Sequence, residues 1–357
     1  MQTSHIMGQY AISTICIILL LLGCKKNDPI TNLDPGTIEN QTFNKTVLID
    51  GHEYDGTIIR NCKFNSIKGD GVQIRDVNNL CIENCTFTNI SENAIRFRNS
   101  GGSDGVKILN NQISEIDHNG ILAAENHINT IIKGNLIYNV GLNNSSSLAG
   151  HPHHGIYFQG FNVTITENVI HDIINSEGNC VSIRTYGEIS KNILYNATDH
   201  GVSYFSDHPG DNELLLIENN FIYNNGKRGV NLASNGTTSN HIGEAIVRFN
   251  SIITEDKSSL GTNEALTGVN YNFIGNILIR TDGGSEFIFS THSYTESFNL
   301  TGNSDPGFVD FTNGNLHLNI GSEAQGYATA ATNFPLTDID GETRDETDLD
   351  AGADQSN

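Results

Sequence analysis

The chain has 357 residues, with 19 Lys and Arg against 41 Asp and Glu, so its formal net charge is −22. This excess of negative charge argues against nucleic acid as a partner, because the phosphate backbone would be repelled. Trp is absent, so any stacking on sugar rings must use the eleven Tyr and sixteen Phe. The length fits one elongated domain, since a solenoid grows without needing a larger core.

The N-terminal segment is typical of a targeting signal. An apolar run from Ala11 to Leu22 is followed by Gly23 and Cys24, and residues 21–24 match the lipobox of bacterial lipoproteins. A membrane-spanning helix is the alternative, but the run is shorter than the roughly 20 residues that a bilayer requires. We therefore expect a signal peptide at 1–23, lipidation of Cys24, and anchoring in the bacterial outer membrane, on its periplasmic or surface face. Residues 24–50 are expected to form a tether and N-terminal cap.

Replacing Cys24 by serine is expected to release the protein from membranes, because serine has no sulfur to carry the lipid. The fold should persist, since Cys24 lies outside the repeats described next. Fractionation of cells that express the variant measures this. Retention in the membrane fraction would instead indicate an uncleaved helix or another anchor.

From residue 51 onward, one position recurs at intervals of 23 to 33 residues. It is occupied by Cys62, Cys85, Asn111, Asn135, Asn168, Asn192, Asn220, Asn250 and Asn276. A recurring interval of this size indicates stacked repeats. A column of Asn can link successive turns through its side-chain amides, so we expect these side chains to point into the coil.

Each repeat contains three short segments rich in Val, Ile and Phe. Examples from one repeat are 155–159, 163–166 and 169–173, in which apolar and polar residues alternate. Gly, Asn, Asp or Ser bound these segments, which is typical of β-strands. Three strands per turn, with turns roughly 4.8 Å apart, predict three parallel sheets wound into a coil.

This pattern resembles the right-handed parallel β-helix proteins of the pectate-lyase-like superfamily over residues 51–300. The resemblance implies an all-β, three-sheet solenoid of about nine to ten turns. Residues 301–357, which include Asp305–Asp310 and Asp350–Asp354, resemble the C-terminal segment of secreted bacterial β-helix proteins. We expect this segment to cap the open end of the coil, where unpaired backbone groups would promote aggregation.

Cys62 and Cys85 occupy successive turns of the recurring position. They are close enough in the predicted stack to form a disulfide in an oxidising compartment. The alternative is that both are small buried thiols in place of Asn.

A fold does not specify a function, so function must come from residues that point out of the coil. Strand alternation defines two outward columns beside one sheet and a third column just before its strands. The first reads Gln73, Arg96, Leu122, Tyr157, Ser182, Ser203, Asn231; the second reads Arg75, Arg98, Ala124, Gln159, Arg184, Phe205, Ala233. The third reads Asp70, Asn93, Asn119, His154, Asn179, His200, Arg228. Four Arg on one face of so acidic a protein favour a groove for an anionic polymer, and solvated surface charges are the alternative.

The longest interval between Asn residues contains an insertion, 141–154, that ends in His151, His153 and His154. These imidazoles are candidate acid/base groups or metal ligands, or simply parts of a polar loop. His200 lies two turns further along the column of His154. Loops on a rigid scaffold often carry binding residues, so the middle of the coil is the expected site.

Cleavage of an acidic polysaccharide by β-elimination needs a cation for the uronate carboxylate, a base for the C5 proton and an acid for the leaving oxygen. Arg184 suits the first role, His154 or His200 the second and Tyr157 the third. Expected substrate-binding residues are Arg75, Arg96, Arg98, His153, Gln159 and Arg228. The side chains of the candidate catalytic residues His154, Tyr157, Arg184 and His200 are expected to face water, so their replacement should not affect folding.

We therefore expect a monomeric polysaccharide lyase. The alternatives are a non-catalytic glycan-binding or surface structural protein, a uronate C5-epimerase, and a glycoside hydrolase. His151-Pro-His153 is similar to the Asp-Pro-His motif of mannuronan epimerases, with His in place of Asp. No cofactor is required by the sequence, which leaves Ca2+ binding open. A further outward column, Tyr138, His171, Tyr195 and Tyr223, is either packing or a glycan-binding platform.

Overall fold

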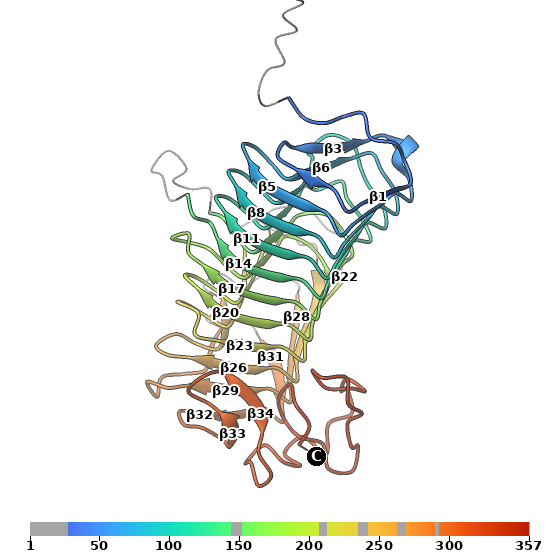
Figure 1. Cartoon of the computed structure of the whole chain (residues 1–357). Helices are drawn as coiled ribbons and strands as arrows, with labels where there is room; N and C mark the ends of the chain where they lie inside the picture. Colours follow the sequence, from blue (N-terminus) through green and yellow to red (C-terminus); the bar gives the residue numbers. More distant parts are fainter. Residues whose placement is uncertain are drawn as a thin grey trace, which may run out of the picture.

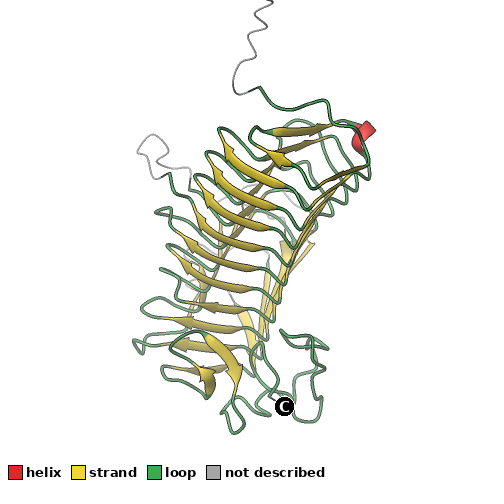
Figure 2. Cartoon of the chain, in the orientation of Figure 1, coloured by secondary structure: helices red, strands yellow, loops and turns green. Residues whose placement is uncertain are grey.

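The computed structural model describes residues 28–143, 152–206, 213–234, 242–262, 269–289 and 293–356. The chain forms a long coil with three short strands per turn (Figure 1), joined by turns and loops (Figure 2). Cys24 and His151 lie outside the described residues. Within them the only helix is the 3-10 turn η1 (His52–Tyr54), and none is long and apolar enough to cross a bilayer.

Strands of successive turns pair in parallel into three sheets. Among the described residues, sheet I contains β1 (Thr37–Glu39), β4 (Ile58–Arg60), β7 (Cys81–Glu83), β10 (Lys107–Leu109), β13 (Ile131–Lys133), β16 (Val163–Thr166), β19 (Gly187–Ser190), β22 (Glu213–Glu218), β25 (Ile242–Arg248), β28 (Asn270–Ile274) and β31 (Tyr294–Ser297). Sheet II contains β2 (Thr42–Phe43), β5 (Lys63–Ile67), β8 (Thr86–Ile90), β11 (Gln112–Ile116), β14 (Leu136–Val140), β17 (Val169–Ile173), β20 (Ile193–Ala197), β23 (Phe221–Tyr223), β26 (Ser251–Thr254), β29 (Ile277–Arg280) and β32 (Leu300–Gly302). Sheet III contains β3 (Val47–Asp50), β6 (Val72–Arg75), β9 (Ile95–Phe97), β12 (Ile121–Ala123), β15 (Ile156–Phe158), β18 (Val181–Ile183), β21 (Val202–Ser206), β24 (Val230–Ser234), β27 (Leu260–Thr262) and β30 (Phe287–Phe289). The predicted three-sheet solenoid is confirmed.

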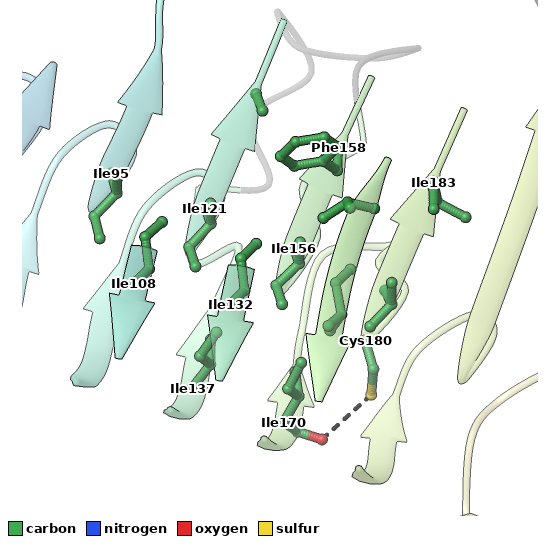
Figure 3. Close-up of a cluster of buried hydrophobic side chains, with 14 of the residues drawn as sticks. Ile95, Ile108, Ile121, Ile132, Ile137, Ile156, Phe158, Ile170, Cys180 and Ile183 are labelled. Carbon is green, nitrogen blue, oxygen red and sulfur yellow. Dashed lines mark hydrogen bonds between the residues drawn. The ribbon is translucent and has the colours of Figure 1, made fainter. Parts of the chain in front are cut away.

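The core lies inside the coil because alternate residues of every strand point inward. In sheet III, Ile121 pairs with Ile156, and Ile156 pairs with Val181, so branched side chains stack turn upon turn. Figure 3 shows such columns from the three sheets, with the Cys180 thiol donating a hydrogen bond of 3.3 Å to the Ile170 carbonyl. A shift of one residue in any turn would bring polar residues inside, so this alternation fixes the register.

The Asn column forms a buried hydrogen-bonded ladder at the corner between sheets I and II, as predicted. Asn168 Oδ1 accepts a hydrogen bond from the backbone N–H of Asn135 at 2.9 Å, and Asn168 Nδ2 donates to Asn192 Oδ1 at 3.0 Å. The same pattern continues down to Asn299. Each side chain therefore pairs backbone groups that would otherwise be unsatisfied inside the coil.

Cys62 and Cys85 start this ladder as buried free thiols. Cys85 Sγ accepts the backbone N–H of Cys62 at 3.4 Å, which is the role that Asn Oδ1 has in later turns. The structure therefore has buried thiols in place of Asn, and not the alternative of a Cys62–Cys85 disulfide.

The coil begins earlier than the expected boundary at residue 51. β1, β2 and β3 already pair with β4, β5 and β6 in the three sheets, so part of the expected cap belongs to the solenoid.

The C-terminal segment packs beside the last turns, whereas we expected it to cover the open end. Its antiparallel strands β33 (Phe308–Asp310) and β34 (Asn315–Leu318) share a buried apolar cluster with Phe221, Ile277 and Ile279. These three residues alternate with the inward Ile222 and Leu278, so they lie on the outer face of sheet II. The Gly352 N–H also donates to the Gly275 carbonyl at 2.7 Å. The segment therefore covers a side of the coil.

Candidate functional site

The outward columns of sheet III have the predicted order. Pairing of β6, β9, β12, β15, β18, β21 and β24 aligns Gln73, Arg96, Leu122, Tyr157, Ser182, Ser203 and Asn231. The structure thus places Tyr157 and Arg184 on successive turns, as the repeat spacing predicts.

The column before these strands is a second hydrogen-bonded ladder, in which His154 and His200 are rungs. His154 Nδ1 accepts hydrogen bonds from the backbone N–H of Asn179 at 3.1 Å and from its Nδ2 at 3.2 Å. His200 Nδ1 accepts the Arg228 backbone N–H at 3.0 Å. His154 is 2% exposed and His200 7%, so the expectation that these side chains face water is wrong. The imidazoles contribute to the fold because Nδ1 takes the place of an Asn side-chain oxygen.

These hydrogen bonds fix the state of both imidazoles. A backbone N–H can only donate, so Nδ1 is the acceptor and Nε2 carries the hydrogen of the neutral ring. Burial, with Arg184, His153 and His200 nearby, lowers the pKa of His154 to about 3. Burial likewise lowers the pKa of His200 to about 4, and the Asp199 carboxylate opposes this shift. At neutral pH both rings are therefore hydrogen-bond donors through Nε2, which disfavours them as general bases.

Arg184 lies between two aromatic rings. Its guanidinium carbon is 5.0 Å from the centre of the Tyr157 ring and 4.9 Å from that of Phe205. Cation–π contacts on both sides hold the charged group in place. The Tyr157 hydroxyl accepts a hydrogen bond of 2.6 Å from Gln159 Nε2, and the Tyr157 ring meets His154 edge-on at 5.2 Å. Tyr157, Arg184 and His154 thus form one constrained cluster.

This cluster lies where two parts of a groove meet. The larger part, of about 820 Å³, includes His154, Arg184 and His200 in its lining, and the smaller part, of about 450 Å³, includes His153, His154, Tyr157, Arg184 and Arg96. The larger part has four cationic side chains and two carboxylates: Arg184, Lys227, Arg228 and Lys257 against Glu177 and Asp199. The groove is therefore a cationic region on an acidic protein, which suits an anionic ligand.

The other predicted arginines have partners along sheet III. Arg75 forms an ion pair with Asp50, and Arg98 donates to Gln73 Oε1 at 2.6 Å. Arg75 and Arg98 do not line either part of the groove. Gln159 does not line it either, but it donates a hydrogen bond to the Tyr157 hydroxyl. Arg96 lines the smaller part and lies 3.6 Å from Asp70. The four arginines are thus not one continuous binding stripe.

Sequence reasoning missed several lining residues that share one position, directly before the second ladder. They are Glu92, His118 and Lys257, and the same position holds His153, Asp199 and Lys227 in other turns. His118 stacks on His153 with ring centres 4.4 Å apart. These residues recur at the same interval as the second ladder, one position before it in the sequence, so the repeat spacing could have identified them.

The aromatic column on sheet II is a packed stack. Ring centres are 5.3 Å apart for Tyr138 and His171, 4.6 Å for His171 and Tyr195, and 4.9 Å for Tyr195 and Tyr223, with planes within 8°. Each inner ring face is covered by its neighbour, and a sugar needs an open face. The geometry favours packing over a glycan platform.

The two buried imidazoles are expected to make the protein less stable in acid. Their pKa values lie below the ordinary 6.5 in the folded state, so below about pH 6.5 the unfolded chain binds more protons and the free energy of unfolding falls. His154→Asn should keep the rung, as Asn119 and Asn179 do in neighbouring turns, and should weaken this pH dependence. Denaturant titrations from neutral pH to about pH 4 measure it. Equal pH dependence in both proteins would contradict the assignment.

Comparisons with known proteins bear on the fold. The sequence profile of the family described as "Right handed beta helix region" matches residues 45–147. No well-characterised protein matches the sequence significantly. Among solved structures, the Azotobacter vinelandii mannuronan C-5 epimerase AlgE4 A-module is 14% identical, with a TM-score of 0.50, over 75% of this chain and 87% of that one. XylC in complex with xylose is 15% identical, with a TM-score of 0.51, over 73% of this chain and 55% of that one. The expected resemblance to right-handed parallel β-helix proteins is therefore confirmed at the level of the fold.

Proposed function

We propose that this protein cleaves an acidic polysaccharide by β-elimination in the groove on sheet III. The observation that carries the proposal is the Tyr157–Arg184–His154 cluster, in which a constrained cation, a phenol and a neutral imidazole donor lie at the junction of a cationic groove. The similarity in fold to a mannuronan epimerase module supports a uronate polymer as the substrate class.

In this reaction the C5–H bond and the bond from C4 to the leaving oxygen break, and a C4–C5 double bond forms. The proton leaves C5 and must reach the leaving oxygen. Arg184 would bind the uronate carboxylate and stabilise the charge that develops as the proton leaves. The His154 Nε2–H would donate a second hydrogen bond to that carboxylate.

Tyr157 would transfer the proton. As a phenolate it takes the C5 proton, and as the resulting phenol it returns this proton to the leaving oxygen, so no other acid is consumed. Gln159 would position the hydroxyl through the 2.6 Å hydrogen bond. We prefer Tyr157 to His154 as the base because His154 Nδ1 is already an acceptor in the ladder.

A non-catalytic glycan-binding protein is the second candidate. Three of the groove's cations lie close together and would hold a polyanion without any chemistry: Lys227 and Arg228 are adjacent on one turn, and Lys257 lies on the next. Neutral imidazoles at the site also suit binding alone.

Incubation of the purified protein with a panel of uronic-acid polymers tests the proposal. A lyase generates the ultraviolet absorbance of an unsaturated uronate at the new chain end. Binding to a polymer without this absorbance, and without new chain ends, would favour the binding protein. New reducing ends without the absorbance would indicate a hydrolase.

A further inference from the structure

Three potential metal ligands meet in the C-terminal segment, away from the groove. They are His317 on β34, Asp340 in the following loop and Asp354 near the C-terminus, and their ligand atoms lie within 4.8 Å of one another. This is the only group of three or more His, Cys, Asp or Glu with such spacing in the described part of the chain. Residues so far apart in sequence converge only because the segment folds back on itself.

The contacts of His317 place an acceptor oxygen beside each of its two ring nitrogens. Its Nδ1 lies 2.5 Å from the Asn315 side-chain oxygen, and its Nε2 lies 2.9 Å from Asp340 Oδ2. Both neighbours are acceptors, whereas a neutral imidazole has only one N–H. With that hydrogen on Nδ1, the Nε2 lone pair faces a carboxylate. A metal ion bound by both groups removes this conflict, as does a second proton on the ring.

The third ligand, Asp354, favours a metal ion over a second proton on the His317 ring. Asp354 is 6% exposed, and its side chain accepts one hydrogen bond, from the Leu318 N–H at 2.6 Å. The fully buried Asp338 also belongs to this part of the segment, where its Oδ2 accepts the Gln355 N–H. A single imidazolium proton lies between Nε2 and Asp340 and cannot also bind Asp354. A divalent ion can bind all three groups.

We propose that His317, Asp340 and Asp354 bind a divalent transition metal of the zinc class. Imidazole nitrogen with carboxylate oxygen suits Zn2+, whereas Ca2+ prefers six to eight oxygen ligands. Ligand atoms around one tetrahedral Zn2+ lie about 3.4 Å apart, so small side-chain movements would close the site. Such an ion would tie the C-terminal residues to β34, whose His317 ring packs edge-on against Phe221 of the coil at 5.0 Å. The site would stabilise the attachment of this segment to the solenoid.

The test uses purified protein without a polyhistidine tag, stripped with chelator and titrated with ZnCl2 or CaCl2. We expect one Zn2+ per chain and a thermal midpoint that rises with Zn2+ and not with Ca2+. His317→Ala and Asp340→Asn should each weaken Zn2+ binding by at least about tenfold, since even outer partners of metal ligands cost that much. The matched control is His52→Ala, which removes an exposed His–Asp pair with a 3.3 Å contact and should leave binding unchanged.

Three results would overturn the proposal. Zn2+ binding that survives both variants and is lost in His153→Ala would place the ion in the groove. If the protein does not bind Zn2+ and its thermal midpoint changes only with salt concentration, the three residues form an ion pair and not a metal site. Equal stabilisation by Ca2+ and Zn2+ would contradict the ligand chemistry.

Discussion

Arg184→Ala is expected to lower turnover on an acidic polysaccharide by about 100-fold or more, the usual scale for loss of a positioned charge in a transition state. The guanidinium is held between Tyr157 and Phe205, so no other groove cation can take its exact place. Arg184→Lys should recover only part of the rate, because an ammonium does not stack between rings as a planar guanidinium does. Initial rates of unsaturated-uronate formation measure both variants.

The matched control for this substitution is Arg60→Ala, which removes a cation from sheet I, where Arg60 Nε binds Glu39 at 2.7 Å. It should leave turnover unchanged, because Arg60 does not line the groove. Turnover that is equally low in the two variants would indicate an effect of net charge. Unchanged turnover in Arg184→Ala would remove this residue from the mechanism.

Asn168→Leu is expected to lower the free energy of unfolding by about 1–3 kcal/mol for each buried group that it leaves unpaired. The affected groups include the Asn135 N–H and the Ile132 carbonyl, which the Asn168 side chain now pairs at 2.9 Å each. Leu has a similar size but no polar atoms, so the loss reports the ladder and not a cavity. Denaturant unfolding followed by circular dichroism measures it.

Asn65→Leu is the control for the ladder variant. Asn65 lies on β5 in sheet II, but its side chain is exposed and outside the ladder. Its replacement should change stability little, since surface substitutions usually lie within about 0.5 kcal/mol. Equal effects of the two substitutions would argue against a structural role for the ladder.

The sequence was sufficient to predict the solenoid because every turn repeats the same pattern of apolar strands and an Asn between them. Asn168 follows an apolar strand and precedes another, as Asn135 and Asn192 do, so one repeat identifies the next. The outward position of Tyr157 then followed from strand alternation alone.

The second ladder was harder to predict because its rungs are chemically mixed. Asp70, Asn93, His154 and His200 share only an atom that can accept a backbone N–H. In the sequence, a histidine in such a column therefore resembles a catalytic residue. In the structure, its Nδ1 accepts a backbone hydrogen bond of the ladder.

The position of the C-terminal segment had no sequence signal of this kind. It lies outside the repeat, and its contacts join residues far apart, such as Arg344 Nη2 with Asn219 Oδ1 at 2.9 Å. Arg344 also stacks on the Phe249 ring at 4.8 Å. Such pairings depend on the complete path of the chain and not on local spacing.

The most direct test of β-elimination is nuclear magnetic resonance of the products formed in D2O from the polymer that the protein binds best. We predict shortened chains with an unsaturated uronate at one end, formed by the wild-type protein and much more slowly by His154→Asn at undiminished stability. Deuterium at C5 in chains of unchanged length would reveal an epimerase, and an unchanged polymer would leave binding as the function. Either result would contradict the lyase.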